Sequence, residues 1–376
     1  MKKIISVLLA LLCVISIAGC KPNYPYEAEY TELGIPLKDY YKTGGIERCV
    51  WDIELYKDEL YVGSGDYDKN KGPVNVWKYN FAEEEWKSNR ALPDEQIERF
   101  FLFNDRLYIA GTDPQSSWSY GNYYYTDGVR WVTMNDLPNG IHNFDLVQFD
   151  GKIFAGMGVQ EMSWPVAVSE DETNWDFVKF EKDGAELDFK GLEYIRVYDF
   201  FVLKDTLYAY LYLGSPAKTR EIYRFDGEKF VCHSDIPMNI KYSRSSYNYF
   251  AQKTEFGGKQ YFTTGHLYKT EDMKTTEIIE FGEKTTVNDI RVIDDVLYIL
   301  CNEKAEDEEG NETFRVSVKR SSDGETFEEM FSFNYPVRAL SFTYGNEHFY
   351  FGMGYGTKAK KEYEQNGMVL SVKNSL

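Results

Sequence analysis

The sequence predicts an all-β protein in which seven small sheets of four strands each form a closed ring. Three observations support this prediction: aromatic residues are abundant, one turn motif recurs along the chain, and its spacing suits four short strands. Phe, Trp and Tyr make up 17% of the chain, with 31 Tyr and 25 Phe. Aromatic side chains favour pleated, half-buried strands, which supports the all-β assignment.

The first twenty residues are typical of an exported protein. Lys2 and Lys3 form a charged region, Ile4 to Ile17 form an apolar run, and small residues precede Cys20. The apolar run is too short to span a bilayer comfortably, which favours a signal peptide over a membrane helix. We therefore expect a signal peptide at 1–19, a lipidated cysteine with a short linker at 20–26, and one folded domain at 27–376.

The stretch Ile17-Ala18-Gly19-Cys20 resembles the lipobox of a bacterial lipoprotein signal. The resemblance implies cleavage before Cys20, a diacylglycerol on its sulfur and acylation of its new amine. Three acyl chains would anchor the protein permanently, because each buried methylene contributes about 0.8 kcal/mol. The expected location is the extracytoplasmic face of a cell membrane or an outer membrane. The alternative is an ordinary signal peptide that a chance cysteine follows.

The mature chain is strongly acidic, because loss of Lys2 and Lys3 changes the formal charge from −19 to −21. Phosphate backbones would repel such a chain, so no nucleic-acid partner is expected. Cys49, Cys232 and Cys301 each lie in a strand-like run. We expect these cysteines to be buried thiols, of which two could form a chance pair.

A tight polar turn between two apolar runs recurs seven times. The turns begin at Lys57, Asn104, Asp150, Lys204, Gly257, Asp294 and Gly345. Asn, Asp and Gly tolerate the positive φ that short hairpins require, so each turn is expected to join two antiparallel strands. Successive turns are about 37 to 54 residues apart, which leaves room for a second pair of strands in each unit.

The second half of each unit has its own signature. An Asp/Gly turn followed by an aromatic residue recurs, and three units end in Leu92-Pro93, Leu137-Pro138 and Ile236-Pro237. Proline lacks the N–H that would extend a sheet, so it ends the unit. The aromatic spacing and terminal Leu-Pro resemble Kelch repeats, and the segment Ser321 to Phe327 resembles the Asp-box of sialidase-type propellers. Both resemblances imply a β-propeller, and the seven units in phase predict seven blades of four strands each.

The last unit lacks a fourth strand. It ends at Leu376 shortly after a third strand predicted at 368–372, so no residues remain for another strand. Glu27 to Leu33 precede the first unit, and we expect them to supply the missing outer strand. This pairing would join the N-terminus to the last blade and cover the open sheet edges.

The predicted loops are long on one face of the ring, here called the long-loop face, and short on the other, the short-turn face. Extended loops usually carry function. Five aromatic residues near the long loops are candidate ligand-binding residues: Tyr67, Trp118, Tyr120, Trp164 and Tyr355. Exposed rings would stack on a sugar or anchor a protein partner, and the alternative is that they pack inward as loop cores.

Alignment of the innermost strands on their turns places charged residues at one level of the central channel. These candidates are Asp52, Arg99, Asp145, Asp199 and Asp289, with Gln252 and Leu340 at the same position in two other units. Converging carboxylates could hold Ca²⁺ or act as catalytic acids. The better supported interpretation is structural, because Asp can accept hydrogen bonds from neighbouring backbone N–H groups. We therefore expect no catalytic residue and no resident metal or cofactor, with Ca²⁺ in this ring as the alternative.

Arginines also begin several innermost strands, at Arg48, Arg99, Arg196 and Arg338. A sialidase would use an arginine triad, but the Arg-Ile-Pro motif that opens that family is absent. We therefore predict a monomeric, membrane-tethered recognition module that binds a glycan or protein ligand through its long-loop face. The alternatives are an exported sialidase-like hydrolase or lyase and an assembly scaffold of the cell envelope.

Overall fold

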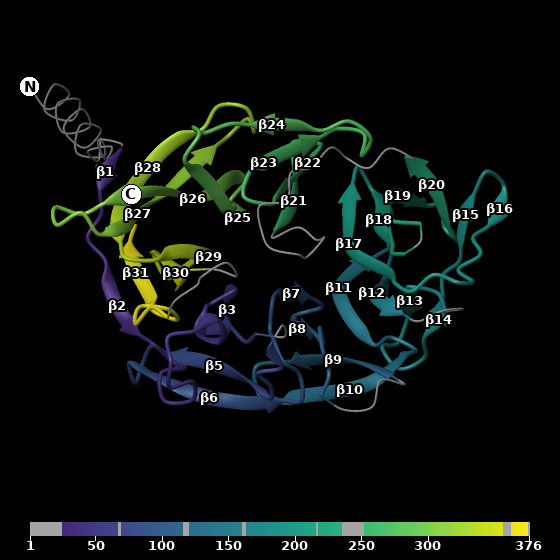
Figure 1. Cartoon of the computed structure of the whole chain (residues 1–376), viewed down its shortest axis with the longest axis horizontal. Coiled ribbons are helices and arrows are strands. Elements are labelled where there is room, and N and C mark those ends of the chain that lie inside the picture. The colour runs from purple at the N-terminus through teal and green to yellow at the C-terminus, as the bar shows by residue number, and fades with distance from the viewer. Residues whose placement is uncertain are drawn as a thin grey trace, which may run out of the picture.

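A computed structural model shows β-sheets arranged in a ring, as in a β-propeller (Figure 1). The structure describes residues 25–66, 69–115, 120–159, 163–215, 217–234, 252–355 and 362–374. The all-β prediction is confirmed, since the helical structure within these ranges is a short 3-10 turn at Ile46–Arg48. None of the described helices is long and apolar enough to cross a membrane. The predicted signal peptide and Cys20 lie outside the described residues.

Five sheets are separate and contain four or five strands each. The first contains β3 (Asp52–Tyr56), β4 (Glu59–Gly63), β5 (Val74–Asn80) and β6 (Glu85–Leu92). The second contains β7 (Phe100–Phe103), β8 (Arg106–Ala110), β9 (Tyr120–Thr126) and β10 (Trp131–Pro138). The third contains β21 (Lys253–Phe256), β22 (Lys259–Thr263), β23 (Leu267–Thr270) and β24 (Glu277–Ile279). The fourth contains β25 (Thr285–Ile293), β26 (Val296–Glu306), β27 (Glu312–Ser321), β28 (Glu328–Tyr335) and β1 (Tyr26–Glu27). The fifth contains β29 (Arg338–Gly345), β30 (His348–Gly354), β31 (Val369–Lys373) and β2 (Thr31–Gly34).

The remaining sheet has ten strands. It contains β11 (His142–Phe149), β12 (Lys152–Val159), β13 (Val166–Ser169), β14 (Asp176–Phe177), β15 (Phe180–Lys182), β16 (Ala185–Glu186), β17 (Ile195–Leu203), β18 (Thr206–Leu213), β19 (Thr219–Phe225) and β20 (Phe230–Ser234). Two successive four-stranded units, β11–β14 and β17–β20, share this sheet because β12 pairs with β17. The prediction of seven separate blades is therefore wrong at this point.

Glycine in β12 explains why the two units merge. A Cβ on Gly156 would lie 2.9 Å from the carbonyl oxygen of Val197 in β17. Only a residue without a side chain permits this close approach. β12 can therefore reach β17, and Gly158 pairs with Arg196 across the junction.

The predicted closure by an N-terminal strand is confirmed. β2 pairs antiparallel with β31 through Thr31 and Ser371, which completes the fifth sheet. β1 also pairs parallel with β28, so the N-terminal segment borders two sheets (Figure 1). The ring of Tyr30, between these strands, lies 5.4 Å from that of Phe333. These contacts hold the beginning of the described chain against the end of the ring.

The seven predicted hairpin turns are all present. Both central residues of every turn have positive φ, as in Asp294 and Asp295 with φ of 48° and 58°. In the last unit the central pair is Asn346 and Glu347, so Gly345 still belongs to β29. This difference of one residue changes which side chain of β29 reaches the level of the channel carboxylates.

Turns between the third and fourth strands use side-chain oxygens as backbone acceptors. In the turn at Ser321, the serine Oγ accepts the Gly324 N–H at 2.9 Å, and Asp323 Oδ1 accepts the N–H groups of Glu325 and Thr326 at 2.8 Å each. Thr270 with Asp272 and Ser169 with Asp171 make equivalent bonds. These bonds satisfy donors that strand pairing leaves open.

Replacing Gly324 by alanine is expected to lower the free energy of unfolding by about 2–4 kcal/mol. Gly324 has φ of +75°, and a Cβ there would lie 2.1 Å from the hydroxyl of the buried Tyr261. The change therefore adds overpacking to backbone strain. Gly151→Ala is the matched control, because Gly151 has φ of +73° and no atom within 4 Å of its Cβ position. Urea unfolding should show a loss of only about 1 kcal/mol for Gly151→Ala, and equal losses would contradict the packing argument.

The hydrophobic core lies between neighbouring units. In its largest cluster, the Phe154 ring of β12 lies 6.3 Å from the Phe200 ring of β17 and 6.5 Å from the Phe230 ring of β20. Cys49 and Cys301 are buried and Cys232 is half-buried, and none of the three forms a disulfide with another described residue. Aromatic packing between sheets thus accounts for the high Phe and Tyr content.

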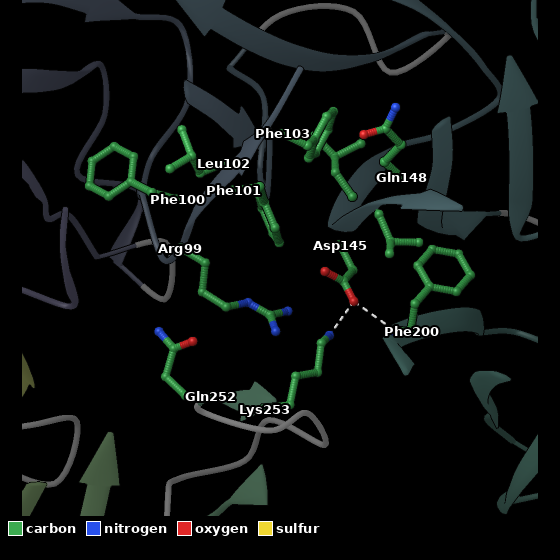
Figure 2. Close-up of a pocket in the computed structure, with 12 residues that line it drawn as sticks. Arg99, Phe100, Phe101, Leu102, Phe103, Asp145, Gln148, Phe200, Gln252 and Lys253 are labelled. Carbon is green, nitrogen blue, oxygen red and sulfur yellow. Dashed lines mark hydrogen bonds and ion pairs between the residues drawn. The ribbon is translucent and has the colours of Figure 1, made fainter. Parts of the chain in front are cut away.

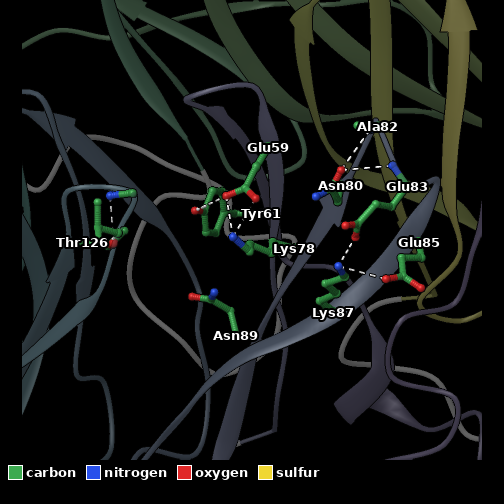
Figure 3. Close-up of polar contacts among 12 residues, drawn as sticks. Glu59, Tyr61, Lys78, Asn80, Ala82, Glu83, Glu85, Lys87, Asn89 and Thr126 are labelled. Atoms are coloured by element: carbon green, nitrogen blue, oxygen red, sulfur yellow. Dashed lines mark hydrogen bonds and ion pairs between the residues drawn. The ribbon is translucent and has the colours of Figure 1, made fainter.

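Ion pairs cover part of the outer surface. In the first sheet, Lys78 Nζ lies 2.6 Å from Glu59 Oε1 and joins β5 to β4 (Figure 3). Lys87 Nζ lies 2.9 Å from Glu85 Oε1 on β6. Such pairs reduce the repulsion among the many acidic side chains of this chain.

Candidate functional site

Three of the predicted channel carboxylates each link their own innermost strand to the following one, which joins β3 to β7, β11 to β17 and β25 to β29. The Phe100 N–H donates to Asp52 Oδ2 at 2.8 Å, the Phe200 N–H to Asp145 Oδ2 at 2.6 Å, and the Phe342 N–H to Asp289 Oδ2 at 2.8 Å. All four ring aspartates, Asp199 included, have exposed fractions of 1% or less. These are the hydrogen bonds that the structural interpretation of the ring requires.

Local backbone geometry redirects the side chains of Asp145, Asp199 and Asp289. The pairing register shifts between Asn143 and Asp145 in β11, between Val197 and Asp199 in β17, and between Val287 and Asp289 in β25. Each shift is a β-bulge, which bends the strand and redirects the side chain that follows it.

One predicted member of the ring is wrong by one residue. Ser341, and not Leu340, lies at the level of the aspartates, because Gly345 extends β29 and the register shifts between Ala339 and Ser341. Ser341 Oγ donates to the Val50 carbonyl at 3.2 Å, so it also joins the last unit to the first. Leu340 is instead buried beside Cys49 and Trp51.

Two cations join one half of the ring, in what we call the first ion-pair group: Arg99, Asp145, Asp199 and Lys253 (Figure 2). Arg99 precedes β7, yet its Nη1 donates to Asp199 Oδ1 on β17 at 2.9 Å. Lys253 on β21 contacts Asp145 on β11 and donates to Asp199 Oδ1 at 2.9 Å. Each cation therefore passes over one innermost strand to reach the next.

The second ion-pair group consists of Arg291, Asp52, Glu54 and Asp289. Arg291 on β25 donates through Nη2 to Asp52 Oδ1 on β3 at 2.9 Å and contacts Glu54 through Nη1. Its Nε lies 3.7 Å from Asp289 Oδ2. Arg291 thus passes over β29, and the two groups together place three cations and five carboxylates at the centre of the ring.

Sequence reasoning missed Lys253, Arg291 and Glu54. For Lys253 a signal existed, because the residue after the aligned position is apolar in the other units, as in Ile53, Leu146 and Ile290. For Arg291 the strand pattern carries no such exception, and two of its three carboxylate partners, Asp52 and Glu54, lie more than 230 positions earlier in the sequence. Only the closure of the ring brings these residues together.

Burial raises the pKa of Asp52 from its usual 3.8 to about 7, although Arg291 opposes the shift and the nearby Asp289 and Glu54 add to it. The pKa of Asp289 is raised by burial as well, again against the effect of Arg291. In the described part of the chain, no group of three or more His, Cys, Asp or Glu side chains is arranged to hold a metal ion. The ring carboxylates instead accept backbone N–H groups and contact cationic side chains.

The raised pKa of Asp52 predicts a pH dependence of stability. Because the folded chain binds this proton more tightly than the unfolded chain, the contribution is fully present below pH about 4 and is lost as the pH rises through about 7. Asp52→Asn should therefore flatten the fall in unfolding free energy over this range. Urea unfolding at several pH values tests this, with the exposed Asp39→Asn as control. An unchanged slope in Asp52→Asn would contradict the assignment.

The five aromatic residues predicted to bind a ligand differ in where the structure places them. Tyr67 and Trp118 lie outside the described residues, and Tyr120 is the first residue of β9. Trp164 packs against Phe180 and Phe189 at ring distances of 6.5 and 5.1 Å, which is the loop-core alternative. Tyr355 is half-buried, stacks on Tyr363 at 4.4 Å and donates to Glu312 Oε1 at 2.7 Å.

A different aromatic group lies where β11 and β17 begin, at the long-loop end of the channel. We call Phe144, Tyr194, Arg196 and Tyr198 the mouth cluster. The guanidinium carbon of Arg196 lies 5.6, 5.2 and 5.8 Å from the rings of Phe144, Tyr194 and Tyr198, respectively. Tyr194 is 49% exposed, and Arg196 Nη1 donates to the Tyr198 hydroxyl at 2.9 Å. The sequence marked Arg196 at a strand entrance but did not predict its aromatic surroundings.

Two titratable side chains border the mouth cluster. The ring of His142 stacks on Phe144 at 5.6 Å, and burial together with Arg196 lowers the pKa of His142 to about 4. Burial raises the pKa of Asp113, and Arg196 opposes that shift. His142 is therefore neutral at physiological pH, which leaves Arg196 as the cation of this group.

No protein-family model matches the sequence, and no curated protein matches it significantly. Solved structures do resemble it. Virginiamycin B lyase from Staphylococcus aureus is similar with a TM-score of 0.53 at 10% identity, over 92% of this chain and 99% of that one. A chain in a mitotic checkpoint complex is similar with a TM-score of 0.52 at 9% identity, over 96% of this chain and 99% of that one. At such low identity these similarities show the β-propeller fold alone.

Proposed function

We propose that this chain is a non-catalytic recognition propeller that binds a glycan or protein ligand at its long-loop face. The observation that carries the proposal is the contrast between the two charged regions. In the channel, the described cations and carboxylates contact one another across the ring. In the mouth cluster, Arg196 lies among aromatic rings and Tyr194 is half-exposed.

The chemistry of the mouth cluster suits recognition. Aromatic faces stack on the C–H groups of sugars or anchor apolar side chains of a protein, and a guanidinium between them adds hydrogen-bond donors. The rings of Phe144 and Tyr198 lie 4.7 Å apart, so Arg196 is supported on more than one side. This arrangement orders the site before any ligand arrives, which lowers the entropy cost of binding.

We also propose that the two units of the ten-stranded sheet serve as two blades, which makes the ring seven-bladed with a Kelch-like and Asp-box-like repeat. The proposed anchor is a lipid on Cys20 that places the ring on the extracytoplasmic side of a membrane. Metabolic labelling with a palmitate analogue tests the anchor: the label should appear in the wild type, and its persistence in Cys20→Ala would exclude this site.

We expect Tyr194→Ala and Arg196→Ala each to weaken binding of the natural ligand by at least about tenfold, because each removes part of one shared surface. A glycan array and cross-linking in the native envelope, both with the full chain, identify the ligand and measure the loss. The controls are Tyr30→Ala, a tyrosine of 39% exposure beside β28, and Arg130→Ala, an exposed arginine on the short-turn face. Equal binding by all four variants would refute the proposed site.

A further inference from the structure

A pocket of about 400 Å³ borders the first ion-pair group on the side that faces away from the mouth cluster. Its walls are Phe100–Phe103 of β7 and Asp145–Gln148 of β11, and Phe200, Gln252 and Lys253 complete it. Both strands end in hairpin turns of the short-turn face, just beyond Phe103 and Phe149. Leu102, at 56% exposure, lies near this end. The pocket therefore opens away from the mouth cluster.

The two cations of this pocket depart from the repeat. Lys253 stands where β3, β7, β11, β17 and β25 carry the buried apolar residues Ile53, Phe100, Leu146, Phe200 and Ile290. Arg99 stands where four other units carry aspartate. Both side chains point toward Asp145 in the same space (Figure 2). Residues that break a repeat pattern together, in one cavity, indicate a function beyond the fold.

Lys253 can serve a ligand as well as the ring. Its side chain is 16% exposed, compared with 1% for Asp145 and 0% for Asp199. An ammonium group has three N–H donors, and the ion pairs with Asp145 and Asp199 use two of them. The third can be donated to an oxygen in the pocket, although Lys253 Nζ also lies 5.6 Å from the centre of the Phe201 ring. The amides of Gln148 and Gln252 line the same pocket, and Gln148 Nε2 donates to Asn104 Oδ1 at 2.7 Å, which leaves its oxygen as an acceptor.

We propose that this pocket binds a neutral sugar ring, at a site separate from the long-loop face. The first ion-pair group contains two cations and two carboxylates, so its net charge is zero. Net charge therefore favours neither an anionic nor a cationic ligand. Hydroxyl groups both donate and accept, as do the amides at the pocket, and the Lys253 ammonium supplies a charged donor.

The walls of the pocket supply the apolar contacts that sugar binding also requires. Phe101 is half-buried and points toward Arg99 and Asp145 (Figure 2), and its ring centre lies 5.7 Å from the Arg99 guanidinium carbon. Val147 and Leu102 extend the apolar surface. Aromatic and aliphatic walls contact the C–H face of a sugar, while a few polar groups fix its orientation.

Saturation-transfer NMR on the full chain in a sugar-free detergent tests the proposal with glucose, galactose, mannose and N-acetylglucosamine. At least one sugar should bind saturably. Phe101→Leu, which keeps apolar volume but removes the ring, and Gln148→Ala should each weaken binding about tenfold, equivalent to about 1.4 kcal/mol. The matched control is Glu255→Ala, an exposed residue at the corresponding position of β21 outside the pocket.

Three results would overturn the proposal. The first is that no sugar of the panel binds at about 10 mM, a concentration at which a site of millimolar Kd would be largely occupied. The second is that both pocket variants bind the sugar as well as the wild type does. The third is that glucuronate binds more tightly than glucose, which would show that the site prefers an anionic sugar to a neutral one. Arg196→Ala separates this site from the long-loop face, because it should leave sugar binding in the pocket unchanged.

Discussion

Arg291→Met is expected to lower the free energy of unfolding by about 3–5 kcal/mol, the largest effect of any single substitution proposed for this chain. Arg291 contacts Asp52, Glu54 and Asp289, and its loss would leave three carboxylates close together without a cation. Asp52 and Asp289 have exposed fractions of 1% and 0%, so water cannot replace the guanidinium. Urea unfolding followed by tryptophan fluorescence measures the loss.

Arg315→Met is the matched control for this prediction. Arg315 pairs with Glu329 on the outer strands β27 and β28, and its side chain is 38% exposed. Arg315 is partly exposed, and Lys319 Nζ still lies 2.7 Å from Glu329 Oε2 when Arg315 is removed, so Arg315→Met should cost much less than Arg291→Met. Adding Glu54→Gln to Arg291→Met should recover part of the stability, because one of the uncompensated charges is removed. Equal losses in the two single variants would show that Arg291 has no special role in closing the ring.

Asp145→Ala is expected to cost about 3 kcal/mol, whereas Asp145→Asn should cost distinctly less. Alanine removes the acceptor of the Phe200 N–H and a partner of Lys253, so a buried donor and a cation each lose an oxygen. Asparagine keeps one acceptor oxygen at the same place. Thermal or urea unfolding of both variants, beside the fully exposed Asp39→Asn, measures the difference.

The same two variants distinguish the structural interpretation from the enzymatic alternative. If Asp145 serves the fold, binding of the long-loop ligand by Asp145→Asn should match that of the wild type. If Asp145 acts as a catalytic acid in a hydrolase or lyase, Asp145→Asn would stay folded and lose turnover of a glycan substrate. Loss of turnover without loss of stability would therefore overturn the non-catalytic proposal.

Local features of the chain were predictable because they depend on a few neighbouring residues. The hairpin turns follow from residue types that tolerate positive φ, and pairs such as Asp294 and Asp295 adopt it. The N-terminal closing strand followed from a count of strands in the last unit, and β2 pairs with β31 as expected. The aspartates of the innermost strands also followed from alignment, since every hairpin places them at a similar distance from its turn.

Errors arose where a small local difference changes the pairing over distance. Asn346 and Glu347 form the last turn, so Gly345 extends β29 and Ser341 replaces Leu340 in the ring. Gly156 lets β12 approach β17, and the pairing of these strands merges two units that the repeat predicted as separate. A pattern of side-chain types carries little information about such backbone approaches.

The sequence by itself determined the all-β class, the hairpin turns, the closing strand and the level at which carboxylates line the channel. The tertiary structure decided which charges meet there, because Arg99, Lys253 and Arg291 each reach past a neighbouring strand. It also decided that Arg196 lies among Phe144, Tyr194 and Tyr198 at the mouth. The physical reason is that hairpin formation depends on adjacent residues, whereas contacts across the ring exist only after closure brings distant strands together.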